Sequence, residues 1–389
     1  MAAFFSGAAL RVCDALIPRL ARDYSVTPGT AGRVIISFSV AYGLMQLVFG
    51  PLGDRFGKAR MIGLALAACA LAALACALAP GFDGLVGLRM FWGMGAAGVI
   101  PLSMALIGDM VPYEERQATL ARLLTGILSG MMAGQLAGGL YADSAWGWRG
   151  AFGTLAAGYA LVAVLLAVNM RGMHAHAAEP GRLAFVGQLR SVVSVPWARV
   201  ILASVAVEGV FLLGPMAYLP AFLHARHGLS LAAASGLVAL YAAGGLVYAM
   251  AARWLVREWG ERRMVLAGGG LIGAGFLLLW ATPWWITAGP LALLLGFGTY
   301  LYHNTLQTHA TQMAPQVRGT AVASFAFCLF AGQAVGVSAA GAVLDRYGFT
   351  LLFVVPGLVL PAAGALLARA LAARASREAA QAAGPSLRW

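Results

Sequence analysis

The sequence predicts an all-α membrane protein in which twelve transmembrane helices form two pseudo-symmetric bundles of six. Three observations carry this prediction: a strongly apolar composition, apolar runs as long as a membrane span, and a second half that repeats the pattern of the first. Of the 389 residues, 61% are hydrophobic and 10% are charged, whereas soluble domains carry about 25% charged residues. Most of this chain therefore cannot face water.

Apolar runs follow one another along the whole chain. About 20 residues cross a hydrocarbon core of ~30 Å as a helix, and a backbone in lipid must satisfy its own hydrogen bonds. The runs are too long and continuous for barrel strands. The first run begins almost at Met1 and has no basic leader, so we expect a retained span and not a cleaved signal. The predicted spans are residues 2–20, 29–50, 61–79, 83–107, 117–141, 150–170, 198–223, 231–254, 264–281, 285–309, 319–342 and 349–371.

Basic residues are divided unevenly between the two sets of loops that alternate along the chain. The set that includes residues 50–60 and both termini holds 18 Lys and Arg, and the other set holds 6. The positive-inside rule then predicts a multi-pass protein of the bacterial inner (plasma) membrane with both termini in the cytoplasm. Because the net charge of +12 comes from these loop arginines, nucleic acid is not an expected partner.

The longest loop divides the chain into two halves of six spans. We predict an N-terminal bundle at residues 1–170, a cytoplasmic linker at 171–197, a C-terminal bundle at 198–372 and a cytoplasmic tail at 373–389. Within the linker, apolar residues at positions 186, 189 and 193 fit a short interfacial helix about as well as a plain linker.

The two halves resemble each other when the chain is shifted by about 203 residues. "GPLGDRFGKAR" (50–60) then overlays "RWLVREWGERR" (253–263), and "LYAD" (140–143) overlays "AVLD" (342–345). Residues 116–135 overlay residues 318–337 in the same order. Two parallel six-helix halves are the architecture of a transporter that binds its substrate near the membrane midplane, between the halves.

The stretch at 50–60, which we call the latch loop, places four charges between two apolar runs. It resembles the signature loop between the second and third helices of the major facilitator superfamily, and the resemblance covers essentially the whole chain. Its acid and bases could pair with each other and with helix ends of the other bundle in one conformational state. The alternative is that its charges only set topology. The predicted conformational latch comprises Gly50, Asp54, Arg55, Gly57, Lys58 and Arg60.

Two further motifs resemble the family with departures. "LRMFWGMGAAG" (88–98) supplies Arg89 of a fourth-span motif but has Trp92 where Gln is usual. "GMMAGQLAGG" (130–139) has the glycines of the fifth-span antiporter motif but Gln135 where Pro is usual. The small residues predict close helix packing, and the missing Pro weakens the inference of antiport.

Ionisable groups inside a membrane are costly, so they are candidate functional groups. The proton-coupling candidates are Asp14, Glu208 and His303. Asp14 has Arg11 one turn earlier, which favours either a structural ion pair or a tuned proton site. Glu208 and His303 equally fit structural hydrogen bonds between helices. The substrate-cavity candidates are Arg11, Gln46, Arg89, Gln135, Tyr300, Asn304, Gln307 and Gln333.

The sequence therefore predicts a secondary transporter and not an enzyme, with no cofactor and no metal. We expect a monomer in the lipid bilayer that uses protons to export small amphipathic compounds or metabolites by alternating access. One alternative is a proton symporter that imports a small organic anion through Arg11 or Arg89. Another is a membrane receptor or assembly factor that transports nothing. No phosphate-binding Walker loop is present in the sequence, so an ATP-driven pump is not expected.

Overall fold

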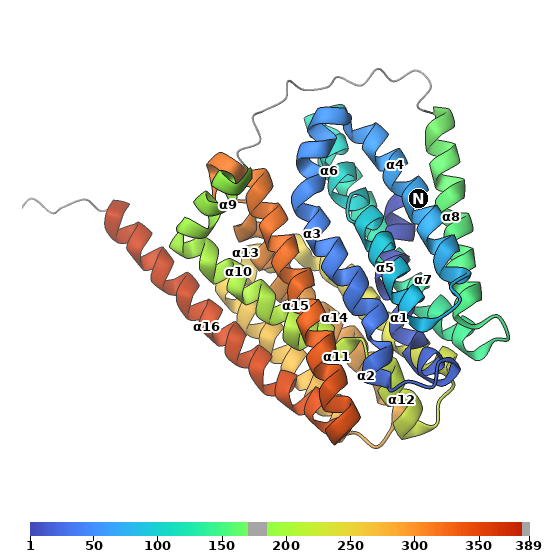
Figure 1. The fold of residues 1–389 in the computed structure, drawn as a ribbon. Coiled ribbons are helices and arrows are strands. Elements are labelled where there is room, and N and C mark those ends of the chain that lie inside the picture. The colour runs from blue at the N-terminus through green and yellow to red at the C-terminus, as the bar shows by residue number, and fades with distance from the viewer. Residues whose placement is uncertain (170–184, 383–389) are drawn as a thin grey trace, which may run out of the picture.

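The computed structural model describes residues 1–169 and 185–382, and these residues form helices joined by short turns (Figure 1). Most of the predicted linker and the end of the tail lie outside the described residues. In the first half, residues 1–169, the helices are α1 (Ala2–Asp23), α2 (Pro28–Ala31), α3 (Arg33–Phe56), α4 (Lys58–Ala77), α5 (Phe82–Ala96), α6 (Val99–Met110), α7 (Tyr113–Asp143) and α8 (Gly147–Asn169).

The second half, residues 185–382, repeats this succession of long helices. Its elements are α9 (Phe185–Ser194), α10 (Pro196–Glu208), η1 (Gly209–Leu213), α11 (Gly214–Met216), α12 (Leu219–His227), α13 (Leu231–Ala281), η2 (Trp285–Thr287), α14 (Ala288–Ala310), η3 (Pro315–Val317), α15 (Arg318–Tyr347) and α16 (Thr350–Ala382).

The described residues contain 10 helical segments that are long and apolar enough to cross a membrane. Helix α1, with its buried Arg11 and Asp14, is not among them. Helix α13 has 51 residues and joins the predicted eighth and ninth spans, with a non-helical residue at Gly260. Twelve spans result when α1 is counted and α13 is counted as two.

The predicted loops at 50–60 and 253–263 are wrong in extent. Helix α3 continues to Phe56 and α4 begins at Lys58, so the helix is broken at Gly57, where φ is 87°. The repeat-related Gly260 breaks α13 with φ 68°. Such left-handed backbone favours glycine, so one residue suffices for each turn. The overlay of Gly57 on Gly260 is thus confirmed in backbone conformation.

Two predicted spans are interrupted. Residues 83–107 divide into α5 and α6, and residues 198–223 pass from α10 through the π-helical turn η1 into α11 and α12. A hydropathy pattern reports where lipid lies and not where the backbone changes its hydrogen bonding. Of the two readings of the linker, the helical one is confirmed for residues 185–194, which form α9.

Glycines let α7 pack directly on the backbone of α1. A Cβ on Gly134 would overlap the carbonyl oxygen of Ala8, and one on Gly138 would overlap that of Val12. In the second half, a Cβ on Gly336 of α15 would overlap the carbonyl oxygen of Val210 in η1. The close packing predicted from the fifth-span motif is confirmed, and the repeat-related helix pair uses the same device.

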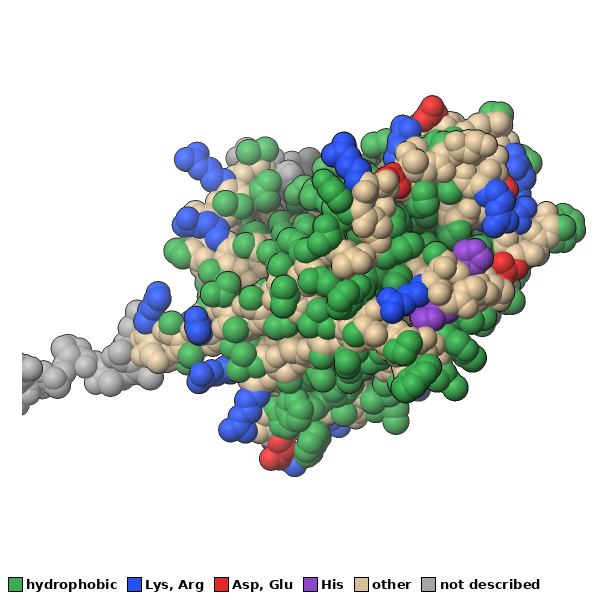
Figure 2. All heavy atoms as spheres, turned by 90° about the horizontal axis from the view of Figure 1, so that it is seen from below, with side chains coloured by type: hydrophobic (Ala, Val, Ile, Leu, Met, Phe, Trp, Pro, Cys, Tyr) green, Lys and Arg blue, Asp and Glu red, His purple; other side chains and the backbone are tan. Residues whose placement is uncertain are grey.

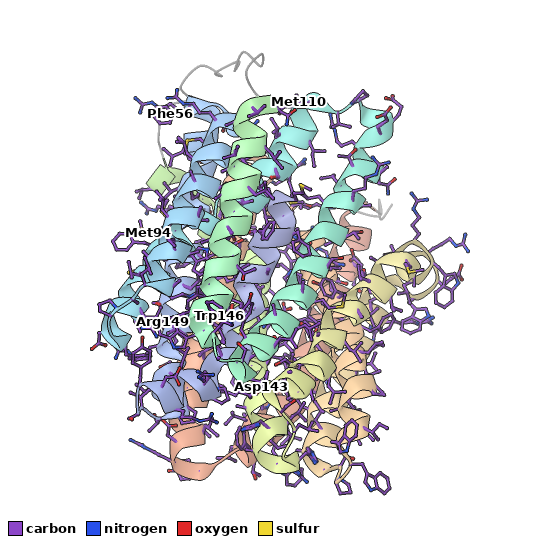
Figure 3. All side chains as sticks on the ribbon, turned by 90° about the vertical axis from the view of Figure 1, so that its right-hand side faces the viewer. Phe56, Met94, Met110, Asp143, Trp146 and Arg149 are labelled. Carbon is purple, nitrogen blue, oxygen red and sulfur yellow. The ribbon has the colours of Figure 1, made fainter. Side chains whose placement is uncertain are left out.

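The helices of the two halves run side by side, with α3 next to α15 and α7 next to α13. Figure 1 shows the halves close together near α2, α11 and α12 and further apart at the opposite end, near α6 and α9. We call the end with Phe56 and Met110 the latch end and the end with Asp143 and Trp146 the far end. Figure 3 labels these four residues.

Candidate functional site: two buried pairs at and beside the contact between the halves

The first pair lies one helical turn apart on α1. Nη1 of Arg11 donates to Oδ2 of Asp14 at 3.2 Å. Both side chains are buried, with 7% of Arg11 and 1% of Asp14 exposed. The guanidinium also lies 5.6 Å from the ring centroid of Tyr241, which belongs to α13 of the other half. The predicted pairing of these two charges is therefore present, and it sits where the halves meet.

A small cavity adjoins this pair. Its volume is about 10 Å³, which is room for one water molecule. It is lined from both halves, by Gln135 of α7 and Tyr241 of α13 among others. Within the part of the chain that the structure describes, Oδ1 of Asp14 and Nε2 of Gln135 are buried without a hydrogen-bond partner. Buried polar atoms of this kind demand a partner, so the cavity has the right chemistry for a water molecule or a polar group.

The second pair joins two helices of the second half. Nδ1 of His303 on α14 lies 3.0 and 3.1 Å from the carboxylate oxygens of Glu208. Glu208 is 1% exposed and is the last residue of α10, directly before the π-helical turn η1. Such turns occur frequently at functional sites. Because an imidazole can be neutral or cationic, this pair can hold one proton more or less without losing its hydrogen bond.

Two tyrosines lie near both pairs. Tyr241 and Tyr300 lie close enough to both Arg11 and Glu208 to interact with their charges. Tyr300 packs against the backbone of α13, since a Cβ on Gly245 would lie 2.5 Å from its ring. Arg11, Glu208 and Tyr300 are separate candidates in the sequence, and the structure brings them into one region.

Other predicted cavity residues have different surroundings. Nε of Arg89 donates to the carbonyl oxygen of Val34 at 3.2 Å, and its guanidinium lies 4.1 Å from the ring centroid of Phe38. Arg89 is 1% exposed and packs inside the first half. Gln46 donates to the carbonyl oxygen of Ala97 at 3.2 Å, also within the first half. Neither side chain lines the small cavity beside Arg11.

The remaining candidates lie on α14 and α15. Along α14, Asn304 is half-buried and Gln307 is exposed, one turn nearer the latch end. Gln333 of α15 is buried, and its backbone nitrogen approaches Gly209 of η1. The polar side chains along α14 thus become more exposed towards the latch end, from the half-buried Tyr300, His303 and Asn304 to the exposed Gln307.

The far end is closed by carboxylates that bond across the halves. Asp345 of α15 accepts the backbone N–H of Gly29 at 3.0 Å and the hydroxyl of Thr27 at 2.6 Å. Asp143 of α7 accepts the backbone N–H of Ala232 in α13 at 2.7 Å. These two acids are the last residues of the repeated "LYAD" and "AVLD". The match is visible in the sequence, but its two acids are not among the predicted site residues.

Backbones approach closely at the same end. A Cβ on Gly29 would lie 2.5 Å from the carbonyl oxygen of Gly341, and one on Gly139 would lie 2.6 Å from that of Leu231. Figure 2 looks onto this end and shows mainly hydrophobic and neutral atoms across its middle, with a basic side chain and histidines to one side of it and most other charged groups towards the periphery. Glycine contacts and carboxylate bonds together close the far end.

The latch loop bonds within its own half. Nζ of Lys58 lies 2.5 Å from Asp109 and 3.7 Å from Asp54. In the second half, Nε2 of His309 lies 3.0 Å from Glu261, which overlays Lys58 at an offset of 203 residues. A hydrogen bond between the halves at this end joins Arg253 to Gln117 at 3.1 Å.

Comparison with known proteins gives a consistent result. Residues 1–337 match the family model described as Major Facilitator Superfamily. The chain is 24% identical over 334 residues to the uncharacterized MFS-type transporter YceJ of Bacillus subtilis, covering 84% of this chain and 83% of YceJ. It is 24% identical over 334 residues to a chloramphenicol resistance protein of Pseudomonas aeruginosa, covering 80% of this chain and 75% of that protein. The crystal structure of the nucleoside transporter NupG (D323A mutant) is similar with a TM-score of 0.75 and 12% identity, covering 96% of this chain and 98% of NupG.

Proposed function

The chain belongs to the major facilitator superfamily and is a multi-pass membrane transport protein, not an enzyme, and we propose that it exports small amphipathic compounds in exchange for protons by alternating access. The observation that carries the proposal is the pair of buried ion pairs, Arg11–Asp14 and Glu208–His303, at and beside the contact between the halves. A carrier that couples to protons needs such groups, which can change charge inside the membrane. The bundles would be residues 1–170 and 198–372, joined by the linker at 171–197.

Charge balance supports a neutral or amphipathic substrate. Arg11 has Asp14 as its counter-charge, and Arg89 packs inside the first half against aromatic rings and a carbonyl oxygen, away from the small cavity between the halves. An imported organic anion needs a cation that is free to bind it, and this weighs against the anion symporter. Membership of a family of transporters weighs against a receptor that transports nothing. The similarity to a chloramphenicol resistance protein adds support for a small organic substrate.

The closed far end supports an assignment of conformational state. By the positive-inside rule the latch end is cytoplasmic and the far end is external. In that orientation the closed far end would make this an inward-facing arrangement, and the half-buried Asn304 and exposed Gln307 would lie on the cytoplasmic side of the buried pairs. Protons would reach Glu208 and His303 from that side, and the exchange would be completed in the opposite, outward-facing state.

The test is transport in proteoliposomes with an imposed pH gradient. Glu208→Gln mimics the protonated carboxyl permanently, so pH-driven movement should be abolished while substrate binding and counterflow persist. Asp14→Asn should do the same if the acids share the task, and should impair folding if Asp14 only pairs with Arg11. Glu261→Gln is the matched control, because Glu261 also pairs with a histidine but lies at the latch end. Survival of pH-driven transport in Glu208→Gln, Asp14→Asn and the double variant would exclude both acids.

A further inference from the structure

An apolar groove runs along the membrane-facing side of the first half. Its volume is about 590 Å³, within the range of pockets that bind organic ligands. Helices α3, α4 and α5 line it with apolar side chains and one glycine. Several lining residues are exposed, including Leu64, Leu71 and Phe91 at 55%, 70% and 64%. Figure 3 shows another, Met94, on the flank of the molecule.

The groove begins next to the latch loop. Along α4, the lining residues run from Met61 to Ala75, a length of about 21 Å at 1.5 Å per residue. This length exceeds one leaflet, which is half of a hydrocarbon core of about 30 Å. In Figure 3, Phe56 lies at the latch end above Met94 on the same flank. A lipid chain that enters beside the latch loop would lie along the groove at its natural depth.

Two arginines stand at the mouth of this groove. Arg60 precedes Leu64 by four residues on α4, and Arg55 follows Leu52 by three on α3, so each shares a helix face with a lining residue. Both arginines are exposed. Among the described residues, no carboxylate lies within ion-pair distance of either of them, whereas Lys58 is taken by Asp109 and Asp54. The two arginines match the headgroup of an anionic lipid, and the apolar groove matches its acyl chain.

We propose that this groove binds an anionic phospholipid, with an acyl chain along α3, α4 and α5 and the phosphate headgroup on Arg55 and Arg60. The site is separate from the two buried pairs, Arg11–Asp14 and Glu208–His303, and does not depend on transport. Its placement in the cytoplasmic leaflet rests on the proposed orientation. Basic residues beside a membrane attract anionic lipids by about fivefold in affinity for each residue, which sets the expected size of the effect.

The test is native mass spectrometry of the delipidated full-length protein with added phosphatidylglycerol or phosphatidylcholine. The wild type should retain phosphatidylglycerol at least about fivefold more tightly. Arg55→Gln with Arg60→Gln should remove that preference. The matched control is Arg262→Gln with Arg263→Gln, from the repeat-related segment of α13, and it should leave the preference intact. Equal binding of the two lipids by the wild type, or an unchanged preference in the first double variant, overturns the proposal.

The groove itself is tested by filling it. Ala68→Phe places a ring among the lining residues and should reduce lipid binding at least about fivefold. Ala67→Phe is the matched control, because Ala67 is also exposed on α4 but does not line the groove. Any folding defect from a large exposed ring would affect both variants. Equal lipid binding by Ala68→Phe and Ala67→Phe would mean that the acyl chain lies elsewhere and would overturn the proposal.

Discussion

At the far end, acids of each half bond to the backbone of the other half, whereas at the latch end the acids of each half pair with basic side chains of their own half. Asp143 and Asp345 make the far-end bonds. At the latch end, Asp109 pairs with Lys58 and Glu261 pairs with His309. Hydrogen bonds to charged groups are worth about 1.5–3 kcal/mol each. The far-end bonds therefore stabilise this state, and we propose that the latch loop bonds across the halves in the opposite one.

Positions that the repeat relates can carry the same charge in both halves or opposite charges. At the far end both halves have an acid at the repeat-related position, Asp143 in the first half and Asp345 in the second. At the latch end the repeat-related residues have opposite signs, since Lys58 is a cation and Glu261 an anion. Each far-end acid accepts a backbone N–H of the other half, so both halves need an acid there. Each latch-end residue needs only a partner of complementary charge or hydrogen bonding within its own half.

The largest effect is expected from Asp54→Asn. Asp54 is exposed and lies 3.7 Å from Lys58, so neutralising it should cost little in the present state. If the latch loop bonds across the halves in the outward-facing state, that state alone loses a charge-assisted bond, and turnover in proteoliposomes should fall about 10–100-fold. Substrate binding in detergent should be unchanged. Asp83→Asn, an exposed acid at the far end, is the control, and normal turnover in Asp54→Asn would reduce the loop to a topology signal.

The next largest effect is expected from Gly341→Ala. Its Cβ would lie 2.6 Å from the Tyr218 hydroxyl and 2.8 Å from the Cα of Gly29, so the far end could not close fully. Overpacking costs about 1–3 kcal/mol, and turnover should fall roughly tenfold. Gly153→Ala is the same change where no atom lies within 4 Å, and it should transport normally. Equal activity of the two variants would show that the far-end backbones need not approach each other.

Much of the fold is predictable from the sequence, because length and hydropathy alone determine which segments lie in lipid. The site is predictable only as separate residues. Glu208 and His303 are 95 positions apart, and no pattern along either helix shows that they face each other. Arg89 shows a second limit. A charge within a span predicts a functional site, but it does not tell which side of the helix the charge occupies, and Arg89 packs inside the first half. The far-end acids could have been found from the sequence, because an acid stands at the same position of both repeats, in "LYAD" and in "AVLD".

A smaller effect is expected from removing one far-end carboxylate. Asp345→Ala loses the bonds to Gly29 and Thr27, and the far end should open about 5–10-fold more often. Asp345→Asn, which keeps an acceptor oxygen, should lie between this variant and the wild type. The readout is labelling of an introduced Ser235→Cys, buried beside Gly139, by an impermeant maleimide. Asp23→Ala, whose bonds stay within the first half, should not increase labelling; if it does so equally, loosening of the fold explains the result.

The smallest effect concerns the two latch-end pairs, which should differ in stability. Lys58→Ala removes a pair in which Asp109 is 54% exposed, so water can replace the lost partner and the cost should stay below about 1 kcal/mol. Glu261→Ala instead removes the hydrogen-bond partner of Nε2 of His309. The His309 residue is 8% exposed, and an unsatisfied buried group costs about 1–3 kcal/mol. Thermal unfolding in detergent should therefore show the larger loss for Glu261→Ala. In a His309→Ala background the Glu261→Ala penalty should disappear, because no buried nitrogen is left without a partner. A penalty that persists there would place the role of Glu261 outside the pair, and the two halves would then use their latch-end charges for different purposes.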